Sequence, residues 1–183
     1  EGEVLIMNGD HPLVDAQDMK NLLESFREYK ADVAVVTAIV KKPGELGRVI
    51  RQNDQLKAIV EARDASADTL KICEINTGFY VIKASILKEL LPLIKNNNSK
   101  GEYYLTDLIT LAQEKKYKVE ALQSNSRIAH GVNTQMELAK ATKFIFKKKA
   151  KKLMEAGVLI LDASSVYIEE TVKVAAGSVI YPN

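Results

Sequence analysis

Apolar and polar residues follow one another along the first forty positions in a pattern that predicts a strand, a helix and a second strand. Residues 4–7 form a short apolar run that ends in a polar turn at residues 8–10, which is typical of a strand buried on both faces. Asp15 can cap the helix that follows. Residues 31–40 are apolar and largely β-branched, which favours a strand. The apolar side of the predicted helix consists of Met19, Leu22, Leu23 and Phe26.

The middle of the chain predicts a hairpin followed by more strands and helices. Residues 41–64 contain Pro43-Gly44 and two β-rich runs on either side of residues 52–55, which is typical of a hairpin. Strands and helices that alternate in this way predict an α/β sheet that is mainly parallel. The further strands are expected at residues 75–82, 119–122 and 127–132, and the further helices at residues 86–94 and 103–114.

The last fifty residues predict one long helix and then a different kind of structure. Residues 134–156 have helical spacing of apolar positions, and Gly157 is a stop signal. In the tail, Ile168, Val174 and Ile180 recur every six residues, with Val166 and Val172 in a second register. A six-residue period is the mark of a parallel β-helix, whose coils must stack to bury their apolar faces. Because two coils are too few to be stable alone, we expect the natural protein to continue.

Composition and charge narrow the possible classes of protein. A chain of 183 residues that is 46% hydrophobic can bury the core of one domain with a short appendage. The net charge is 26 − 24 = +2, which gives no broad argument for binding nucleic acid or an anionic membrane. The single cysteine, Cys73, and the lack of zinc-ligand spacing indicate a reducing compartment, so a cytosolic protein is expected. No apolar run approaches the ~20 residues that span a bilayer.

The predicted long helix carries a cluster of lysines that admits two interpretations. The first is a solvated helix face, and the second is a surface that contacts phosphate or a membrane. The cluster consists of Lys147, Lys148, Lys149, Lys151 and Lys152.

Three polar segments near the predicted strands are candidates for ligand binding. Asp10 follows an apolar strand, where a carboxylate could hold a hard cation, although a Gly-Asp turn is an alternative. Gly47 and Glu61 could offer a backbone N–H and a carboxylate to a sugar, or could be a flexible turn and a surface acid. Asn76 and Thr77 interrupt an apolar strand, so each needs a hydrogen-bond partner, either in a ligand or in the core.

Two later segments also carry polar groups suited to a ligand. Residues 101–107 contain two tyrosines with Glu, Thr and Asp, which suit a polar ring but also suit a helix start with one buried tyrosine. Asn133 could cap the long helix or act as a neutral oxygen ligand for a metal held by Asp10. His11 and His130 are expected to be structural or surface residues, because no Ser or Cys nucleophile motif accompanies them.

In order and spacing, these motifs resemble one family, the bacterial bifunctional N-acetylglucosamine-1-phosphate uridylyltransferases and glucosamine-1-phosphate acetyltransferases. The resemblance covers the whole chain, and its most specific parts are EINTG and the asparagine-rich GEYY motif. The motifs are NGDHPL at 8–13, GELGRVI at 44–50, IVEARDA at 59–65, EINTGFYVI at 74–82, NNNSKGEYYLTD at 96–107, GVN at 131–133 and AGVLILD at 156–162.

The resemblance implies a fold and a division into domains. The fold would be part of a Rossmann-like nucleotidyltransferase sheet, a long linker helix and the start of a left-handed parallel β-helix that forms trimers. Residues 1–133 would be the C-terminal part of the pyrophosphorylase domain, residues 134–157 the linker helix, and residues 158–183 the first coils of the acetyltransferase domain.

The resemblance also implies ligands. Asp10 and Asn133 match magnesium ligands, and Tyr104 and Thr106 match the pocket for the acetamido sugar. Further positions match contacts with the UDP-sugar, whereas no residue of this chain matches a catalytic acid, base or nucleophile. These UDP-sugar positions are Asn8, Gly9, Gly47, Glu61, Asn76 and Asn133.

The activity implied for the parent protein is formation of UDP-N-acetylglucosamine from UTP and N-acetylglucosamine-1-phosphate with Mg²⁺, together with acetylation of glucosamine-1-phosphate. The family's glycine-rich phosphate loop and its acetyl-CoA site match nothing in this sequence. We therefore expect an internal piece that is nearly inactive alone, with no nucleic-acid or membrane partner. The alternatives are another nucleotide-sugar pyrophosphorylase and a non-catalytic assembly module.

Overall fold

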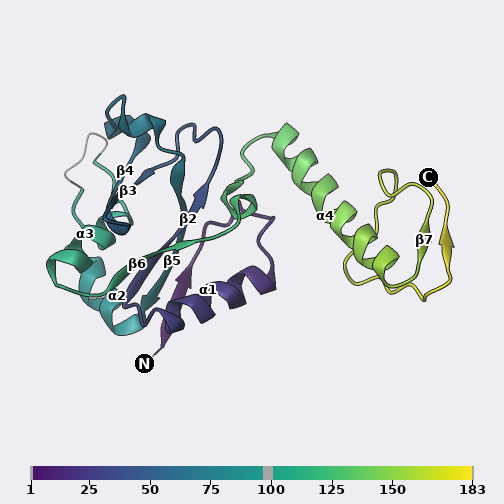
Figure 1. Ribbon diagram of the computed structural model, residues 1–183, viewed down its shortest axis with the longest axis horizontal. Helices are drawn as coiled ribbons and strands as arrows, with labels where there is room; N and C mark the ends of the chain where they lie inside the picture. The colour runs from purple at the N-terminus through teal and green to yellow at the C-terminus, as the bar shows by residue number, and fades with distance from the viewer. Residues whose placement is uncertain (1, 97–100, 183) are drawn as a thin grey trace. The chain divides into compact units, whose positions relative to one another are not determined.

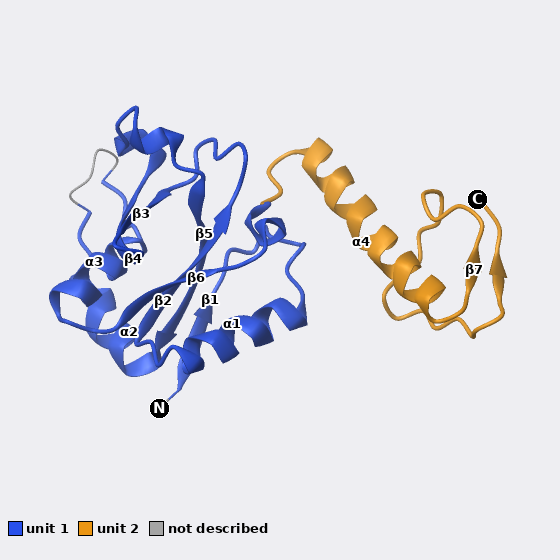
Figure 2. Ribbon diagram, in the orientation of Figure 1, with its two compact units in different colours: residues 1–130 blue, residues 131–183 orange. Residues whose placement is uncertain are grey.

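The computed structural model describes residues 2–96 and 101–182, which fall into two compact units (Figures 1 and 2). Unit 1 comprises residues 1–130 and unit 2 comprises residues 131–183. Each unit has a hydrophobic core of its own. The predicted linker helix and the predicted β-helix coils therefore fall within one compact unit, and their division into two domains stays a prediction.

Unit 1 is built on one mixed β-sheet. Its strands run in the order β4-β3-β5-β2-β6, and β1 pairs with the remaining part of β5. β5 is the central strand, because its register places β3 opposite Ile75 and β1 opposite residues 80–83. The strands are β1 (Glu3–Ile6), β2 (Val33–Ile39), β3 (Arg48–Gln52), β4 (Gln55–Val60), β5 (Glu74–Lys83) and β6 (Val119–Gln123).

The expectation of a mainly parallel sheet is wrong. Among the described strands of this sheet, only β2 and β6 pair in parallel, whereas β1, β2 and β3 all pair antiparallel to β5, and β3 pairs antiparallel to β4. The prediction failed because the central strand, β5, runs in the opposite direction to the strands beside it. Burial on both faces, which the apolar runs do predict, does not depend on the direction of a strand.

Helices cover both faces of this sheet. α1 (Ala16–Glu28) packs through Leu22 and Phe26 on one face, and α2 (Ala84–Leu90) and α3 (Asp107–Glu114) pack on the other. Successive side chains of β2 point to opposite faces of the sheet. Val33 and Val35 belong to one core cluster, whereas residues 34 and 36 belong to clusters on the other face. Asp15 caps α1 through a capping box with Asp18, as the sequence predicts.

The predicted hairpin is confirmed at β3 and β4. Its turn residues, Asn53 and Asp54, both have positive φ angles of 51° and 62°. Two such residues form the tight turn whose twist matches that of paired strands, and Asn and Asp tolerate it better than most residues.

Two other expected elements differ from the structure. Residues 127–132 form no strand, because Ser126–Ala129 is a 3₁₀ turn, η4. α3 begins at Asp107 rather than at residue 103, so Tyr104 and Thr106 lie in the segment before the helix. Residues 97–100 of the asparagine-rich motif lie outside the described residues.

β5 contains an irregularity at its polar segment. Val35 of β2 lies opposite Tyr80, and Thr37 of β2 lies opposite Asn76, so two steps on β2 correspond to four on β5. The extra residues of this bulge are accommodated around Gly78, whose φ is 80°. The interruption that the sequence indicates at residues 76–78 is therefore confirmed.

Unit 2 consists of the long helix α4 (Gln135–Glu155) and a small apolar tail. Thr134 is the N-cap, with a capping box to Glu137, and Gly157 follows the helix with a φ of 91°. The tail contains one parallel strand pair, β7 (Leu159–Ile160) and β8 (Val179–Ile180). The residues that pack around Ala150 and Leu153 are Val158, Ile160, Ala163, Val166, Ile168, Val174 and Ile180.

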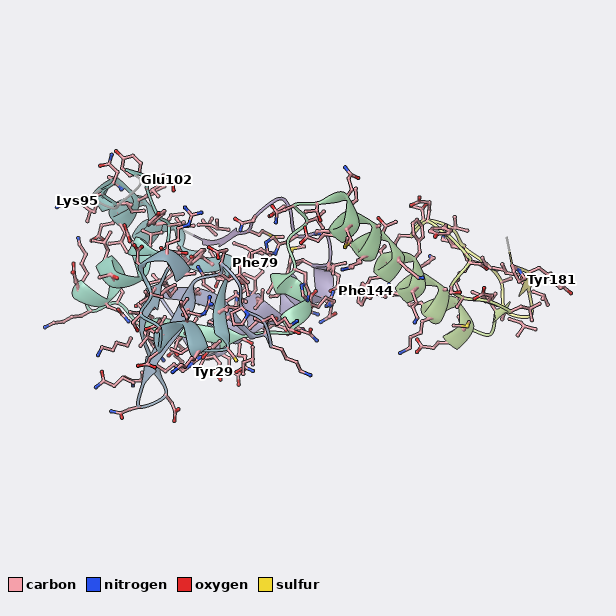
Figure 3. The ribbon with its side chains drawn as sticks, turned by 90° about the horizontal axis from the view of Figure 1, so that it is seen from above. Tyr29, Phe79, Lys95, Glu102, Phe144 and Tyr181 are labelled. Atoms are coloured by element: carbon pink, nitrogen blue, oxygen red, sulfur yellow. The ribbon has the colours of Figure 1, made fainter. Side chains whose placement is uncertain are left out.

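The six-residue period therefore gathers Ile168, Val174 and Ile180 into one core, whereas Val172 of the second register is 42% exposed. Tyr181 is likewise exposed, at the tail of unit 2 (Figure 3). One pair of two-residue strands does not amount to a coil, so the left-handed β-helix stays a prediction.

The lysine cluster of α4 is only partly a solvated face. Lys149 is 8% exposed, and its Nζ donates a hydrogen bond to the Glu170 backbone oxygen at 2.6 Å. Lys152 forms an ion pair with the Glu170 carboxylate at 3.1 Å. The solvated interpretation is therefore wrong at Lys149, which ties the tail to the helix. Across the described part of the chain, no helix combines the length and the apolar character needed to span a bilayer.

Candidate functional site

The site begins where the hairpin leaves the body of the sheet, with Gly47 directly before β3 and Glu61 directly after β4. A Cβ atom built on Gly47 would lie 3.3 Å from Glu61 Oε1, so a side chain there would crowd this carboxylate, which the glycine lets approach the backbone. Gly47 is buried and Glu61 is half-buried. The interpretation of these residues as a flexible turn and a surface acid is therefore wrong.

Asn76 joins this pair from β5. Its backbone N–H donates to the Gly47 carbonyl at 2.9 Å. Its side-chain Oδ1 accepts from the Gly78 N–H at 2.9 Å, and its Nδ2 donates to the Tyr80 hydroxyl at 3.0 Å. Thr77 instead donates to the Val36 carbonyl at 2.8 Å, which identifies it as a satisfied core residue.

Asn8 meets the same segment from the loop after β1. A Cβ atom built on Gly78 would lie only 2.5 Å from Asn8 Nδ2, so a side chain at position 78 would displace Asn8. The absence of a side chain at Gly78 therefore lets the loop after β1 approach the middle of β5. Gly9 and Asp10 follow Asn8 and are exposed.

His11 holds the loop that carries Asp10. Its Nδ1 lies 2.7 Å from the Ile128 carbonyl oxygen, and its ring centroid lies 4.9 Å from that of Phe79, which Figure 3 labels. The side chain of His11 is only 7% exposed, and its Nε2 lies 3.5 Å from Asp10 Oδ1. These contacts support the structural role expected of His11 and fix the loop beside the Asp10 carboxylate.

Thr106 and Tyr104 approach Glu61 from the segment before α3. Burial raises the pKa of Glu61, and the nearby carboxylates of Asp64 and Asp107 raise it further, against the opposing hydrogen bond from Thr106. Burial also raises the pKa of Tyr104, and Glu61 is among the carboxylates that add to the effect. The site is therefore a cluster of acidic, partly desolvated groups that can accept hydrogen bonds from hydroxyl groups.

The structure thus brings six of the predicted residues into one connected cluster within unit 1. Five segments supply them, namely the loop after β1, the residue before β3, the residue after β4, β5 and the segment before α3. Asp10 lies two positions beyond the first of these residues. The six residues are Asn8, Gly47, Glu61, Asn76, Tyr104 and Thr106.

Sequence reasoning missed Tyr80 and Asp64 as neighbours of the site. Tyr80 is 2% exposed, and burial raises its pKa to about 12. Its only sequence signal was a tyrosine within an apolar strand, which also suits a core position. Asp64 follows Glu61 by three residues in the 3₁₀ turn η1 (Ala62–Asp64), and the IVEARDA motif contained it.

Asn133 belongs to unit 2, where it precedes the N-cap of α4. Its backbone N–H donates to Glu137 Oε2 at 2.9 Å, and Thr134 provides the capping oxygen. The interpretation of Asn133 as the cap is therefore wrong, and its side chain is exposed. Its pairing with Asp10 at a metal stays a prediction.

The residues present are compatible with magnesium but do not form a metal cage. In the described residues, no group of three or more His, Cys, Asp or Glu side chains could hold a metal ion. The Asp10 side chain is 43% exposed, which leaves its oxygens accessible. Magnesium is commonly bound in proteins by one or two carboxylates, with water and substrate phosphates completing its shell. A magnesium site in which Asp10 is the carboxylate ligand is consistent with this mode of coordination.

Comparison with known proteins finds relatives that match this chain along its sequence. No protein-family model matches the chain. The bifunctional protein GlmU of Bdellovibrio bacteriovorus is 58% identical over 183 residues, which cover 100% of this chain and 40% of that protein. Every part of this chain is homologous to a segment of GlmU. A GlmU from Carboxydothermus hydrogenoformans is 40% identical over 183 residues, covering 98% of this chain and 41% of the relative. The chain therefore spans about 40% of the length of its GlmU relatives.

Two solved structures have a fold similar to that of this chain. A UDP-N-acetylglucosamine pyrophosphorylase from Trypanosoma brucei matches with a TM-score of 0.61 and 16% identity, covering 89% of this chain and 39% of that one. A protein from Entamoeba histolytica described as a UDP-N-acetylglucosamine pyrophosphorylase matches with a TM-score of 0.66 and 13% identity, covering 98% and 55%. At this identity the likeness shows a mixed α/β fold shared with nucleotidyltransferases.

Proposed function

We propose that this chain holds the sugar of UDP-N-acetylglucosamine in an enzyme that makes this compound from UTP and N-acetylglucosamine-1-phosphate. The observation that carries the proposal is the cluster that joins Gly47, Glu61, Asn76 and Thr106 from separate segments. A half-buried carboxylate beside a bare backbone and an amide is a set of groups suited to sugar hydroxyls. The GlmU relatives and the two pyrophosphorylases of like fold support the same substrate class.

In this proposal, each side chain binds or orients a substrate group. Glu61 accepts hydrogen bonds from ring hydroxyls, and Asn76 offers its remaining amide hydrogen and carbonyl lone pair. Tyr104 and Thr106 border the acetamido group. A phosphate oxygen of the sugar phosphate attacks the α-phosphorus of UTP and displaces pyrophosphate, which needs in-line positioning more than a protein nucleophile.

Asp10 would hold magnesium in this proposal, and a role for Asn133 as a second ligand stays a prediction. Bound there, the ion would neutralise negative charge on the phosphate groups as the new phosphoanhydride bond forms and pyrophosphate leaves. The His11 contacts with Ile128 and Phe79, which anchor the loop that carries Asp10, support this role. Acetylation of glucosamine-1-phosphate and trimeric assembly, the other expectations for the parent protein, stay predictions. So does the expectation that this chain alone is nearly inactive.

Binding of UDP-N-acetylglucosamine to the 183-residue chain tests the proposal. Isothermal titration with Mg²⁺ present is expected to detect binding that Glu61→Gln weakens about tenfold, since a charged hydrogen bond contributes roughly 1.5 kcal/mol. UDP-glucose, which lacks the acetamido group, is expected to bind more weakly than UDP-N-acetylglucosamine.

Glu114→Gln is the matched control, because it makes the same chemical change at an exposed position near the end of α3. If this control weakened binding as much as Glu61→Gln, the site assignment would be wrong. Equal affinity for UDP-glucose would favour another nucleotide-sugar pyrophosphorylase. Failure of the unaltered chain to bind any UDP-sugar would favour a non-catalytic assembly module.

A further inference from the structure

The orientation of the Asn76 side chain can be deduced from its partners. A backbone N–H can only donate a hydrogen bond, so the Asn76 atom that faces the Gly78 N–H at 2.9 Å must be the oxygen. The other amide atom, which faces the Tyr80 hydroxyl at 3.0 Å, must then be the nitrogen. The Tyr80 hydroxyl is therefore the acceptor in this bond, and its own proton is not used in it.

The bulge in β5 makes this contact possible. Four residues of a regular strand span about 13 Å, which is too far for the side chains of Asn76 and Tyr80 to meet easily. Opposite them on β2 lie Thr37 and Val35, which are only two residues apart, or about 7 Å. The bulge thus brings two positions of one strand within hydrogen-bonding distance.

The hydroxyl of Tyr80 has no evident role in packing. Tyr80 is 2% exposed and belongs to the main hydrophobic core of unit 1, where phenylalanine would fill almost the same volume. Burying a hydroxyl is unfavourable unless it gains a partner, and the partner here is an amide of the candidate site. The tyrosine remains protonated at neutral pH, because burial and the nearby Glu61 carboxylate both raise its pKa.

We propose that Tyr80 is a positioning residue whose hydroxyl holds the Asn76 carboxamide in one orientation, leaving one amide hydrogen and one carbonyl lone pair for the sugar. This inference rests on the proposed function and adds a residue from the core to the site. Without the hydroxyl, the amide loses one of the two side-chain hydrogen bonds that the described residues give it, keeps its bond to Gly78 and can rotate more freely. Ligand binding must then order it, which weakens affinity.

A double-mutant cycle with Tyr80→Phe and Asn76→Ala tests the proposal, with UDP-N-acetylglucosamine as the probe. Tyr80→Phe alone is expected to raise the Kd about fivefold to tenfold. In the Asn76→Ala background, the same change is expected to leave the Kd within about twofold, because the residue acts through Asn76. Additive effects of the two changes would overturn the proposal, since Tyr80 would then act directly or through the general fold.

Tyr117→Phe is the matched control. It also removes one phenolic hydroxyl from unit 1, but that hydroxyl donates to the Glu89 carboxylate at 2.6 Å, away from the site residues. This variant is expected to bind the probe as the unaltered chain does. An equal loss of affinity in Tyr117→Phe would overturn the positioning role, because loss of any hydroxyl would then suffice.

The side-chain amide signals of Asn76 provide a readout that needs no ligand. In a ¹⁵N correlation spectrum, Tyr80→Phe is expected to shift this N–H pair toward the position of free amides and to speed its exchange with water. Unchanged Asn76 signals would overturn the proposal even if affinity fell. If the unaltered chain did not bind the probe, the proposed function would fail, and these signals alone would decide whether Tyr80 orients Asn76.

Discussion

Glu61 illustrates how a residue proposed to bind substrate can oppose stability. It lies against the bare backbone of Gly47, and burial raises its pKa, with Asp64 and Asp107 adding to the effect. A neutral side chain would be easier to bury there, but it could not accept hydrogen bonds with the strength of a carboxylate. Groups with such shifts are frequent at functional sites, where function takes precedence over stability.

Replacing this carboxylate should therefore stabilise the protein at neutral pH. The folded-state pKa of Glu61 is raised, so its favourable contribution is complete below the unfolded-state pKa and is lost as pH rises through the folded-state value. Glu61→Gln is expected to raise the Tm at pH 7 by about 1–2 °C, and the difference should vanish near pH 4. Thermal scans across pH measure it, and a lower Tm at pH 7 would contradict it.

At the residue scale, the sequence predicted the polar groups of the site but not all their neighbours. Asn8, Gly47 and Asn76 stand in motifs, and the structure connects them. Tyr80 could not be predicted, because its contact with Asn76 depends on how many residues of β5 oppose two residues of β2. That register is a property of the paired strands and leaves no pattern in either strand alone.

At the scale of elements, the helices were predictable from their capping signals. The sequence placed the start of α1 at Asp15 and that of α4 near Thr134, and both residues are N-caps with capping boxes. The start of α3 was predicted too early, because Thr106 lies before the helix and its side chain does not cap it. Its hydrogen bond to Glu61 instead serves the site.

The capping box of α4 offers a direct test at this scale. Thr134→Ala removes the oxygen that accepts from the Glu137 N–H, which is expected to destabilise the first turn by about 1 kcal/mol. Hydrogen exchange at the Glu137 amide, followed by NMR, should accelerate about fivefold. Thr134→Ser should keep most of the protection, and equal loss in both variants would contradict a role for the hydroxyl.

The direction of the strands could not be predicted from the same signals. An apolar run such as residues 33–36 is buried on both faces in parallel and antiparallel sheets alike, so alternation with helices favoured the parallel arrangement. β5 enters the sheet between β1 and β2 and runs against both. That choice depends on pairing between distant segments, which no local pattern determines.

At the scale of the whole molecule, the apolar core is divided between the two units. Val35 is fully buried in the main cluster of unit 1, and Leu153 is 8% exposed in the cluster of unit 2. The tail of unit 2 depends on contacts such as that of Lys149 with Glu170 as well as on apolar packing. We therefore expect two cooperative unfolding transitions, one for each unit.

Core substitutions should separate these transitions. Val35→Ala is expected to destabilise unit 1 by about 2 kcal/mol, and Leu153→Ala to destabilise unit 2 by about 2–3 kcal/mol, because each leaves a cavity. In differential scanning calorimetry, each variant should lower one transition temperature and leave the other unchanged. A single transition lowered by both variants would contradict independent unfolding.

The meeting of Asn8 and Gly78 has a consequence for how sequences of this kind diverge. A Cβ atom at position 78 would come within 2.5 Å of the Asn8 amide, and the φ of 80° also disfavours a side chain there. A side chain at residue 78 would have to displace the Asn8 amide and adopt a strained backbone conformation, so it is expected together with a change at residue 8 or loss of the bulge. These two positions, seventy residues apart in the sequence, are thus expected to covary among related sequences, and Gly78 is expected to change less often than Asn8.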